Sequence, residues 1–249
     1  MTQASPCPLP ADAGFLAPPR HLASYTYPGS PSALAVDAAG GVLLLGDTST
    51  RKLLRYSTRR ETPQLVGKSL PVNGAFGIAL DTNAQRAYVS TADGIVAVDF
   101  SGDAARQVGT PVGLRNVEGM AVDPGTGRLY APEYAEGRLH AYDWTGDALA
   151  EAGSPVDVGR RPQQLAIDPS RHRAYVVNVA DGTVSVVDIS GPPRVSATVA
   201  VGRAPYGVAV DPVSHRVFVA GQAEGSVTVI DGCRDPAAHD LRHRQADVN

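Results

Sequence analysis

The stretch "GVAVDPVSHRVFVAG" (residues 207–221) decides the fold, because nearly the same phrase occurs five times along the chain. The copies align on the aspartate that ends the first apolar run. These landmark aspartates are Asp37, Asp81, Asp123, Asp168 and Asp211. The intervals between them are 44, 42, 45 and 43 residues, which predicts a repeat protein.

Each repeat reads as a series of short strands joined by tight turns. A strand of small residues precedes the landmark, and a β-branched or aromatic strand, an Asp-Gly or Glu-Gly turn and a third strand follow it. A weaker fourth strand ends the unit. Repeats of this length with four strands are typical of propeller blades. The sequence therefore predicts an all-β fold, a five-bladed β-propeller of four-stranded antiparallel blades.

The two ends of the repeat region predict how the ring closes. The last repeat ends at Asp231 after three strands, while "HLASYTYPG" (residues 21–29) stands before the first repeat, where an outer strand is expected. We therefore expect this N-terminal strand to complete the last blade. The alternative is an incomplete ring whose edges pair with another chain. The predicted domain covers residues 21–231, between a flexible tail at 1–20 and a polar tail at 232–249.

The landmark aspartates are interpreted as structural residues. An aspartate at the end of a strand accepts backbone N–H bonds and starts a turn. All five repeats have the aspartate, whereas a histidine follows four residues later in two of them, at His172 and His215. A catalytic pair is not expected in every repeat. The alanine two residues before each landmark suits a crowded strand near the axis.

Composition excludes several classes of partner. The net charge is −3 and the isoelectric point about 6.0, so no basic field is present to attract nucleic acid or an anionic membrane. No apolar run approaches the roughly 20 residues of a membrane helix. Residues 1–20 lack the pattern of a signal peptide, which predicts a cytoplasmic protein, or a secreted one if the start is misassigned. Of 22 basic residues 20 are arginine, as in proteins of GC-rich bacteria.

The chain has two cysteines, Cys7 and Cys233, near its opposite ends. Neither has a neighbour at metal-site spacing, which excludes a zinc knuckle. Closure of the ring would bring the two ends together, so a terminal disulfide is one alternative. Two free thiols are the alternative expected in a reducing cytoplasm.

The repeats resemble the YVTN-type β-propellers, with some likeness to NHL and YWTD repeats. The residues that carry the resemblance are "GRRPQQLAIDPSRHRAYVVNVADGTVSVVDIS" (159–190) and "GRAPYGVAVDPVSHRVFVAGQAEGSVTVID" (202–231). The resemblance covers about residues 21–231 and implies the propeller fold. Relatives of this kind bind, scaffold or catalyse, so it does not specify one function.

Function is expected where equivalent positions of the repeats differ. Loops around the mouth of a central channel are common ligand sites. The residues five before each landmark are Ser32, Phe76, Glu118, Gln163 and Tyr206. Arg115, Arg160 and Arg203 stand eight before three successive landmarks, and a guanidinium suits a carboxylate or phosphate. The predicted ligand-binding set is therefore Arg115, Arg160, Arg203, Gln163 and Tyr206. Solvated arginines in a turn are the simpler alternative.

A second resemblance suggests a metal site. Similar loops in the SMP-30/gluconolactonase-like propellers bind a divalent cation, and the resemblance implies Asp47, Glu118, Glu133 and Asn178 as ligands here. A set of oxygen ligands suits Ca²⁺ or Mg²⁺. The alternative is that these side chains are solvated in loops or paired with a nearby arginine.

Nucleophilic catalysis finds little support. There is no G-x-S-x-G elbow, P-loop or Rossmann fingerprint. Resemblance to the virginiamycin B lyase-like propellers implies a histidine base at the channel mouth, but none is placed there, so Tyr206, Tyr134 or a glutamate would have to serve. Two hypotheses follow. The first is a binding or scaffold propeller for a small polar or anionic molecule or a protein partner. The second is a metal-assisted hydrolase or lyase, such as a lactonase.

Overall fold

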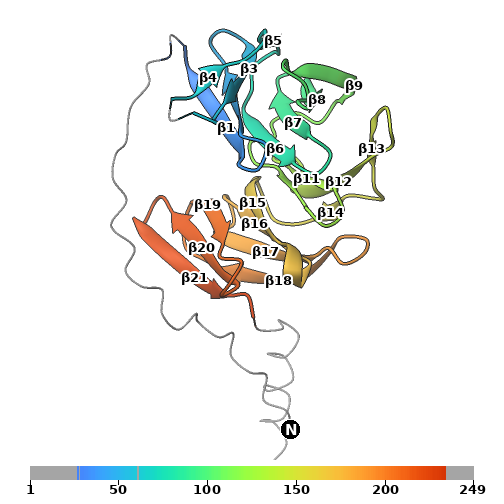
Figure 1. The fold of residues 1–249 in the computed structure, drawn as a ribbon. Helices are drawn as coiled ribbons and strands as arrows, with labels where there is room; N and C mark the ends of the chain where they lie inside the picture. The colour runs from blue at the N-terminus through green and yellow to red at the C-terminus, as the bar shows by residue number, and fades with distance from the viewer. Residues whose placement is uncertain (1–26, 28, 61, 234–249) are drawn as a thin grey trace, which may run out of the picture.

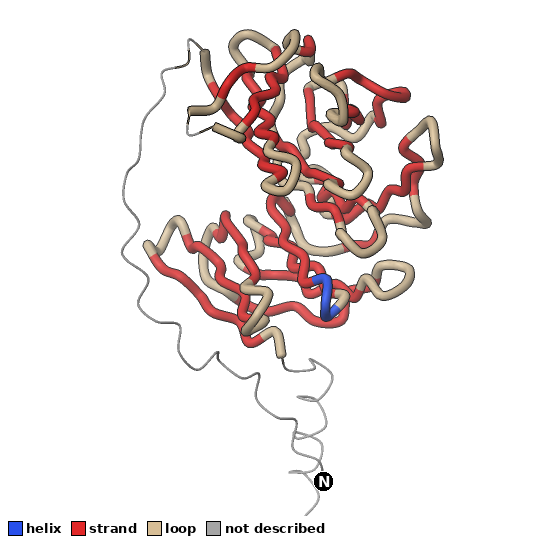
Figure 2. The backbone as a smooth tube through the Cα atoms, viewed as in Figure 1, coloured by secondary structure: helices blue, strands red, loops and turns tan. Residues whose placement is uncertain are grey.

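The computed structural model describes residues 27, 29–60 and 62–233. Five antiparallel sheets follow one another along this part of the chain and are arranged around a common centre, as Figure 1 shows. The one helix among the described residues is the short 3-10 helix η1 (Pro169–Arg171), drawn in blue in Figure 2. It is not long enough to cross a membrane. The predicted all-β class is confirmed.

Each sheet is built from one repeat and contains three to five strands. The first contains β1 (Pro31–Asp37), β2 (Val42–Asp47), β3 (Lys52–Ser57), β4 (Gln64–Leu65) and β5 (Leu70–Pro71). The second contains β6 (Gly77–Asp81), β7 (Arg86–Thr91), β8 (Gly94–Asp99) and β9 (Arg106–Val112). The third contains β10 (Ala121–Val122), β11 (Leu129–Glu133), β12 (Arg138–Trp144), β13 (Leu149–Glu151) and β14 (Val156–Asp157). The fourth contains β15 (Pro162–Asp168), β16 (Arg173–Asn178), β17 (Thr183–Asp188) and β18 (Arg194–Ala200), and the fifth β19 (Pro205–Val210), β20 (Arg216–Gly221) and β21 (Ser226–Asp231).

The outer strands depart from the predicted count of four per blade. In the first and third sheets the outer strand is broken into two short pieces, which both pair with the third strand. A glycine with positive φ stands between the pieces, Gly67 at 72° and Gly153 at 91°, where the backbone leaves the strand conformation. The fifth sheet has three described strands. Its predicted fourth strand, residues 21–29, falls almost entirely outside the described residues.

Apolar side chains fill the space between adjacent sheets. Among the described residues there are four such cores, one for each pair of neighbouring sheets. The aromatic residue seven after the landmark is buried against the following sheet in three repeats, as Tyr88, Tyr130 and Tyr175. Burial of apolar area at these seams is the main favourable contribution to folding.

The two terminal sheets each leave one face open. Phe218 occupies the position of the three buried tyrosines, but it is 40% exposed because the described residues form no sheet after the fifth. At the other end Leu34 and Val36 of β1 are 63% and 57% exposed. The first and last sheets therefore do not cover one another in the part of the chain that the structure describes, and these residues alone do not form the predicted closed ring.

The landmark aspartates hold the turns between the first and second strands, in agreement with the interpretation from sequence. Each accepts a backbone N–H from a residue two or three positions later, at 2.9–3.2 Å. Asp37, Asp81, Asp123 and Asp168 are buried. Such bonds to an ionised, buried acceptor stabilise a turn more than bonds between neutral groups.

The same aspartates also join neighbouring sheets. The residue four after each landmark has a positive φ, between 50° and 71°. In two repeats its side chain reaches the landmark of the preceding sheet. Gln85 Nε2 donates to Asp37 Oδ2 at 3.0 Å, and His215 Nδ1 lies 2.7 Å from Asp168 Oδ2. A side chain in the turn of one sheet thus fixes that sheet against the preceding one.

Cys233, just after β21, is disulfide-bonded. The expectation of two free thiols is therefore wrong, and the alternative with a disulfide holds for this residue. Cys7 lies outside the described residues.

The double role of Asp168 predicts a large effect of its removal. Asp168→Ala loses the bonds to Ser170, Arg171 and His215, and should lower the free energy of unfolding by about 2–3 kcal/mol. Asp211→Ala is the matched control, because Asp211 holds its own turn and belongs to the last sheet of the described chain. Urea denaturation should show the smaller loss for Asp211→Ala. Equal losses would refute the contribution of the contact between sheets.

Two aspartates after the third strands predict the acid sensitivity of the fold. Hydrogen bonds from Ser101, assisted by Arg106, hold the pKa of Asp99 at about 2, and Ser190 with Arg194 does the same for Asp188. Both pKa values lie below those of the unfolded chain, so this stabilisation is present above about pH 4 and is lost as the pH falls through 2. Thermal melting from pH 5 to 2 should be less pH-dependent in Asp99→Asn/Asp188→Asn than in the wild type. An equal pH dependence in the two proteins would contradict this contribution.

Candidate functional site

The centre of the molecule is lined by the beginning of each first strand and by the residues just before it. The first strands of successive sheets lie side by side, β1 next to β6, β6 next to β10, β10 next to β15 and β15 next to β19. Close contacts tie these segments together. Ser32 Oγ donates to the Ala75 carbonyl at 2.5 Å, and Gly119 N donates to the Gln163 carbonyl at 2.9 Å. Gly77 lies directly against the Glu118 carbonyl, where a Cβ would collide.

Three of the central side chains meet at one carboxylate. Gln163 Nε2 donates to Glu118 Oε2 at 2.5 Å, and Tyr206 OH donates to the same oxygen at 3.0 Å. The residues come from the third, fourth and fifth sheets. The hydrogen bond to Glu118, with some desolvation, raises the pKa of the Tyr206 hydroxyl, which therefore stays protonated and donates at neutral pH. We call Glu118, Gln163 and Tyr206 the hub cluster.

Two of the five equivalent positions carry exposed aromatic residues. Phe76 holds the equivalent position in the second sheet and is exposed, as is the ring of Tyr206. Glu118 is also exposed to solvent, so its negative charge is accessible at the centre. A carboxylate next to exposed aromatic rings can attract a cation, by charge and by the negative face of the ring.

The four residues of the predicted metal set have separate partners. Asp47 is buried and accepts from Tyr27, Ser30, Ser49 and Thr50. Burial alone would raise its pKa, but these hydrogen bonds outweigh it and lower the pKa well below the usual range. Asn178 is buried as well and bonds to Gly159, Thr183 and Ser185. Both side chains hold turns of their own sheet.

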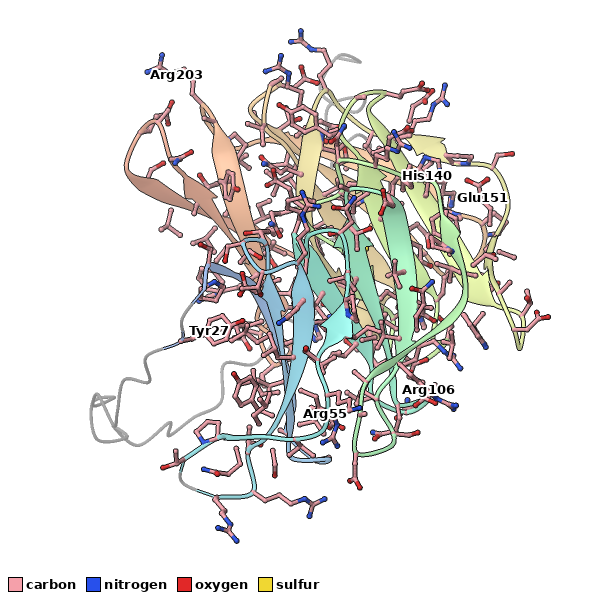
Figure 3. All side chains as sticks on the ribbon, turned by 90° about the horizontal axis from the view of Figure 1, so that it is seen from above. Tyr27, Arg55, Arg106, His140, Glu151 and Arg203 are labelled. Atoms are coloured by element: carbon pink, nitrogen blue, oxygen red, sulfur yellow. The ribbon has the colours of Figure 1, made fainter. Side chains whose placement is uncertain are left out.

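Glu133, the third member of the predicted metal set, bonds to a histidine. His140 Nε2 lies 3.0 Å from Glu133 Oε2, and His140 Nδ1 lies 2.7 Å from Glu151 Oε1. Figure 3 shows His140 and Glu151 next to each other. Glu118, the fourth member, belongs to the hub cluster. Within the described ranges, no three His, Cys, Asp or Glu side chains are arranged to hold a metal ion.

Sequence reasoning missed this Glu133–His140–Glu151 group. The strand register contains the information that could have found it. His140 and Tyr142 are two residues apart and lie on the same face of β12, and Glu151 pairs directly with Tyr142. The pairing of β13 with β12 had to be known before the two glutamates could be placed on either side of the histidine.

Two of the three predicted arginines pair with acids of their own sheet. Arg160 Nε donates to Asp181 Oδ1 at 2.6 Å, and its main-chain N donates to Oδ2 at 2.7 Å. These bonds lower the pKa of Asp181. Arg203 pairs in the same way with Glu224, its N donating at 3.1 Å, and Figure 3 shows it projecting from the edge of the molecule. Arg160 and Arg203 therefore each join the segment before the first strand of their sheet to the turn between its second and third strands.

The remaining ligand candidates lie apart from these pairs. Arg115 is exposed. Tyr134, a candidate base, has the Arg161 guanidinium 5.7 Å from the centre of its ring. A pocket of about 510 Å³ between the third and fourth sheets is lined by Arg160, Arg161 and Asp181 among others, but not by the hub cluster. The structure thus brings together Gln163, Tyr206 and Glu118, whereas Arg160 and Arg203 pair with acids outside this cluster.

Comparisons with known proteins identify the fold. No protein-family model matches the chain, and no curated protein does. Solved structures do match it. A protein of unknown function from Desulfotomaculum acetoxidans is 15% identical with a TM-score of 0.69, over 83% of this chain and 70% of that one. The periplasmic gluconolactonase of Pseudomonas aeruginosa is 14% identical with a TM-score of 0.67, over 83% and 66%.

The Swd1 β-propeller domain of Myceliophteria thermophila is 10% identical with a TM-score of 0.62, over 81% of this chain and 65% of that one. The chain spans about two thirds of the length of these three structures. At such low identity the likeness shows the fold alone. The comparisons therefore establish that this chain has a β-propeller fold.

Proposed function

We propose that the protein is a binding propeller that recognises a positively charged group at its centre. The ligand is an amine, quaternary ammonium or guanidinium group, carried by a small molecule or by a protein partner. The observation that carries the proposal is the hub cluster, in which two neutral donors orient one exposed carboxylate oxygen.

The charge balance of the hub cluster supports a cationic ligand. Gln163 and Tyr206 are neutral, so the cluster keeps the single negative charge of Glu118. Their bonds go to Oε2, and no bond from the described residues goes to Oε1, which remains available to a ligand. The exposed rings of Phe76 and Tyr206 offer cation–π contacts of about 0.5–1 kcal/mol each.

The contacts of Arg160 and Arg203 give less support to the anionic ligand that was predicted from the arginines. Arg160 and Arg203 already have carboxylate partners in their own sheets. An anion would have to compete with Asp181 and Glu224 for the guanidinium groups. A cation at the centre displaces no such pair.

We also propose that the five sheets form a five-bladed ring in which residues 21–29 supply the fourth strand of the last blade. The last sheet has three described strands, whereas the others have at least four. Among the described strands, β21 pairs with β20 alone, and its other edge is where we place the fourth strand.

The alternative function, a divalent-metal-assisted hydrolase or lyase, receives less support from the contacts. Asp47 and Asn178 would have to give up several hydrogen bonds each to reach a metal ion. Breaking the hydrogen bonds of buried polar side chains costs free energy. Glu118 and Glu133 remain as candidate oxygen ligands, but they have different partners.

The hub proposal predicts selective binding of choline over its neutral carbon analogue dimethylbutanol, as measured by titration calorimetry. Glu118→Gln removes the charge and should weaken binding at least tenfold, about 1.4 kcal/mol. Tyr206→Phe keeps the ring and should have a smaller effect. Phe76→Leu removes a ring and should weaken binding several-fold.

Glu224→Gln is the matched control for this titration, because it removes an exposed carboxylate from the rim of the same sheet that carries Tyr206. It should leave the affinity unchanged. Equal binding of choline and the neutral analogue, or equal losses in Glu118→Gln and Glu224→Gln, would exclude the hub as a cation site.

Thermal melting with divalent cations separates the two functions. We expect Ca²⁺, Mg²⁺ and Mn²⁺ each to leave the melting temperature at the value measured in EDTA. A metal bound at a hundred times its Kd would instead add about 2.7 kcal/mol of stability. A cation-specific increase that is abolished by Glu118→Gln/Glu133→Gln would favour the hydrolase or lyase.

A further inference from the structure

One of the landmark aspartates has a buried carboxylate oxygen that receives no hydrogen bond. In every sheet Oδ1 of the landmark accepts a backbone N–H of its own turn. In four sheets Oδ2 also has a side-chain partner, which is Gln85, Thr126, His215 or Ser214. In the second sheet no hydrogen bond from the described residues reaches Oδ2 of Asp81, although Asp81 is only 8% exposed. Buried polar atoms normally have a partner, so this oxygen requires one.

Two residues account for the missing contact. The position three after the landmark, which carries a hydroxyl in the third and fifth sheets, is Ala84 in the second. The position in the following sheet that reaches back to the landmark, as Gln85 does, is Gly127 here. A Cβ on Gly127 would lie 3.1 Å from Asp81 Oδ2, so a side chain at this position would stand over the oxygen. Its absence leaves the carboxylate open on that side.

A pocket of about 480 Å³ lies at this place, between the second and third sheets. Its volume falls within the range of about 300–1,000 Å³ that is typical of small-ligand sites. The charged and aromatic residues that line it are Asp81, Arg86, Arg128, Asp143 and Trp144. The landmark ends β6, whereas the hub position stands just before β6 begins. The pocket is therefore at the opposite end of the strand from the hub.

One acid and one base of the pocket have no ion-pair partner. Arg128 donates two bonds of 2.8 Å to Asp143, so these two charges satisfy each other. Asp81 and Arg86 are register partners on β6 and β7, but no ion pair among the described residues includes either of them. The Arg86 guanidinium instead lies over Trp144, with Cζ 4.0 Å from the ring centroid, and its Nε is buried without a hydrogen-bond acceptor.

We propose that this pocket is a second ligand site, which binds a small zwitterion of the α-amino acid type. The ammonium group of the ligand donates to Asp81 Oδ2, and its carboxylate accepts from the Arg86 guanidinium. A guanidinium that stacks on an aromatic ring keeps its N–H groups at the edge, where a carboxylate can bind. The ligand thus supplies both partners that the pocket lacks. The site does not depend on cation binding at the hub.

The charge balance of the pocket favours a zwitterion over a simple amine or acid. The two acids and two bases of the lining give the pocket no net charge. An amine alone would bring a positive charge close to Arg86 and leave that guanidinium without an acceptor. A simple acid would be repelled by Asp81. A ligand that carries both charges on neighbouring atoms avoids both costs.

Tryptophan fluorescence of the full chain tests the site, because Trp144 is the single tryptophan of the chain. Each standard amino acid is titrated in turn, and we expect a saturating change for at least one of them. Its N-acetyl and amide derivatives, which lack the ammonium and carboxylate charges respectively, should bind at least tenfold more weakly. Choline, the probe for the hub, should leave the signal unchanged. Failure of every amino acid to saturate the signal below about 10 mM would overturn the proposal. Equal affinity for the N-acetyl derivative would overturn it as well.

Gly127→Gln tests the location of the site. It places a glutamine where Gln85 stands in the preceding sheet, at a backbone position of similar φ, 71° against 52°. The new side chain should fill the pocket, keep the melting temperature near that of the wild type and abolish the titration. Gly125→Gln is the matched control, because it adds the same side chain to the same turn outside the pocket, and it should bind as the wild type does. Binding that survives Gly127→Gln would place the ligand elsewhere and overturn the proposal.

Asp81→Asn tests the ammonium contact. Asparagine keeps Oδ1, the acceptor of the Ala84 N–H at 3.0 Å, so the turn is retained. The variant should bind the amino acid at least tenfold more weakly, whereas it should bind the N-acetyl derivative no more weakly than the wild type does. Melting curves check that the variant is folded, and the amino acid should raise the melting temperature of the wild type more than that of the variant. An unchanged affinity for the amino acid would refute the role of Asp81.

Discussion

The constraint on which this structure depends is that each sheet is apolar on both faces and needs a neighbour on each side. Tyr130 and Tyr175 make the point, since each is buried only because the next sheet lies over it. A single repeat could not bury such a residue and would be unstable alone. The stability of each sheet therefore depends on its neighbours, and contacts made by the turns fix the position of one sheet relative to the next.

This constraint separates the residues that build the molecule from those that are free to act. Positions inside the seams and at the landmark aspartates repeat, because every sheet faces the same packing problem. The residues five before each landmark, Ser32, Phe76, Glu118, Gln163 and Tyr206, do not belong to the four apolar cores between the sheets. Their side chains differ from one sheet to the next, while the apolar cores keep the same kind of residue. Binding chemistry can therefore vary there while the scaffold stays the same.

Sequence patterns predicted the strands, the turns and the hub positions, because these follow from local periodicity. They did not predict the contacts of Asp47 and Asn178, since a residue ten after the landmark can point either to the centre or into its own turn. Nor did they predict the pairing of His140 with two glutamates. That contact depends on which residues of the outer strand lie opposite β12. The breaks in two outer strands contain Gly67 and Gly153, whose positive φ is seen only in the folded chain.

The common geometry of the seams has an evolutionary consequence. The side of a sheet that carries the aromatic of the second strand always meets the opposite side of the sheet after it. Duplication or removal of one unit would therefore still place an apolar face against an apolar face, although the specific contacts of Gln85 and His215 would be lost or moved. Such events would alter the diameter of the central opening while preserving its wall.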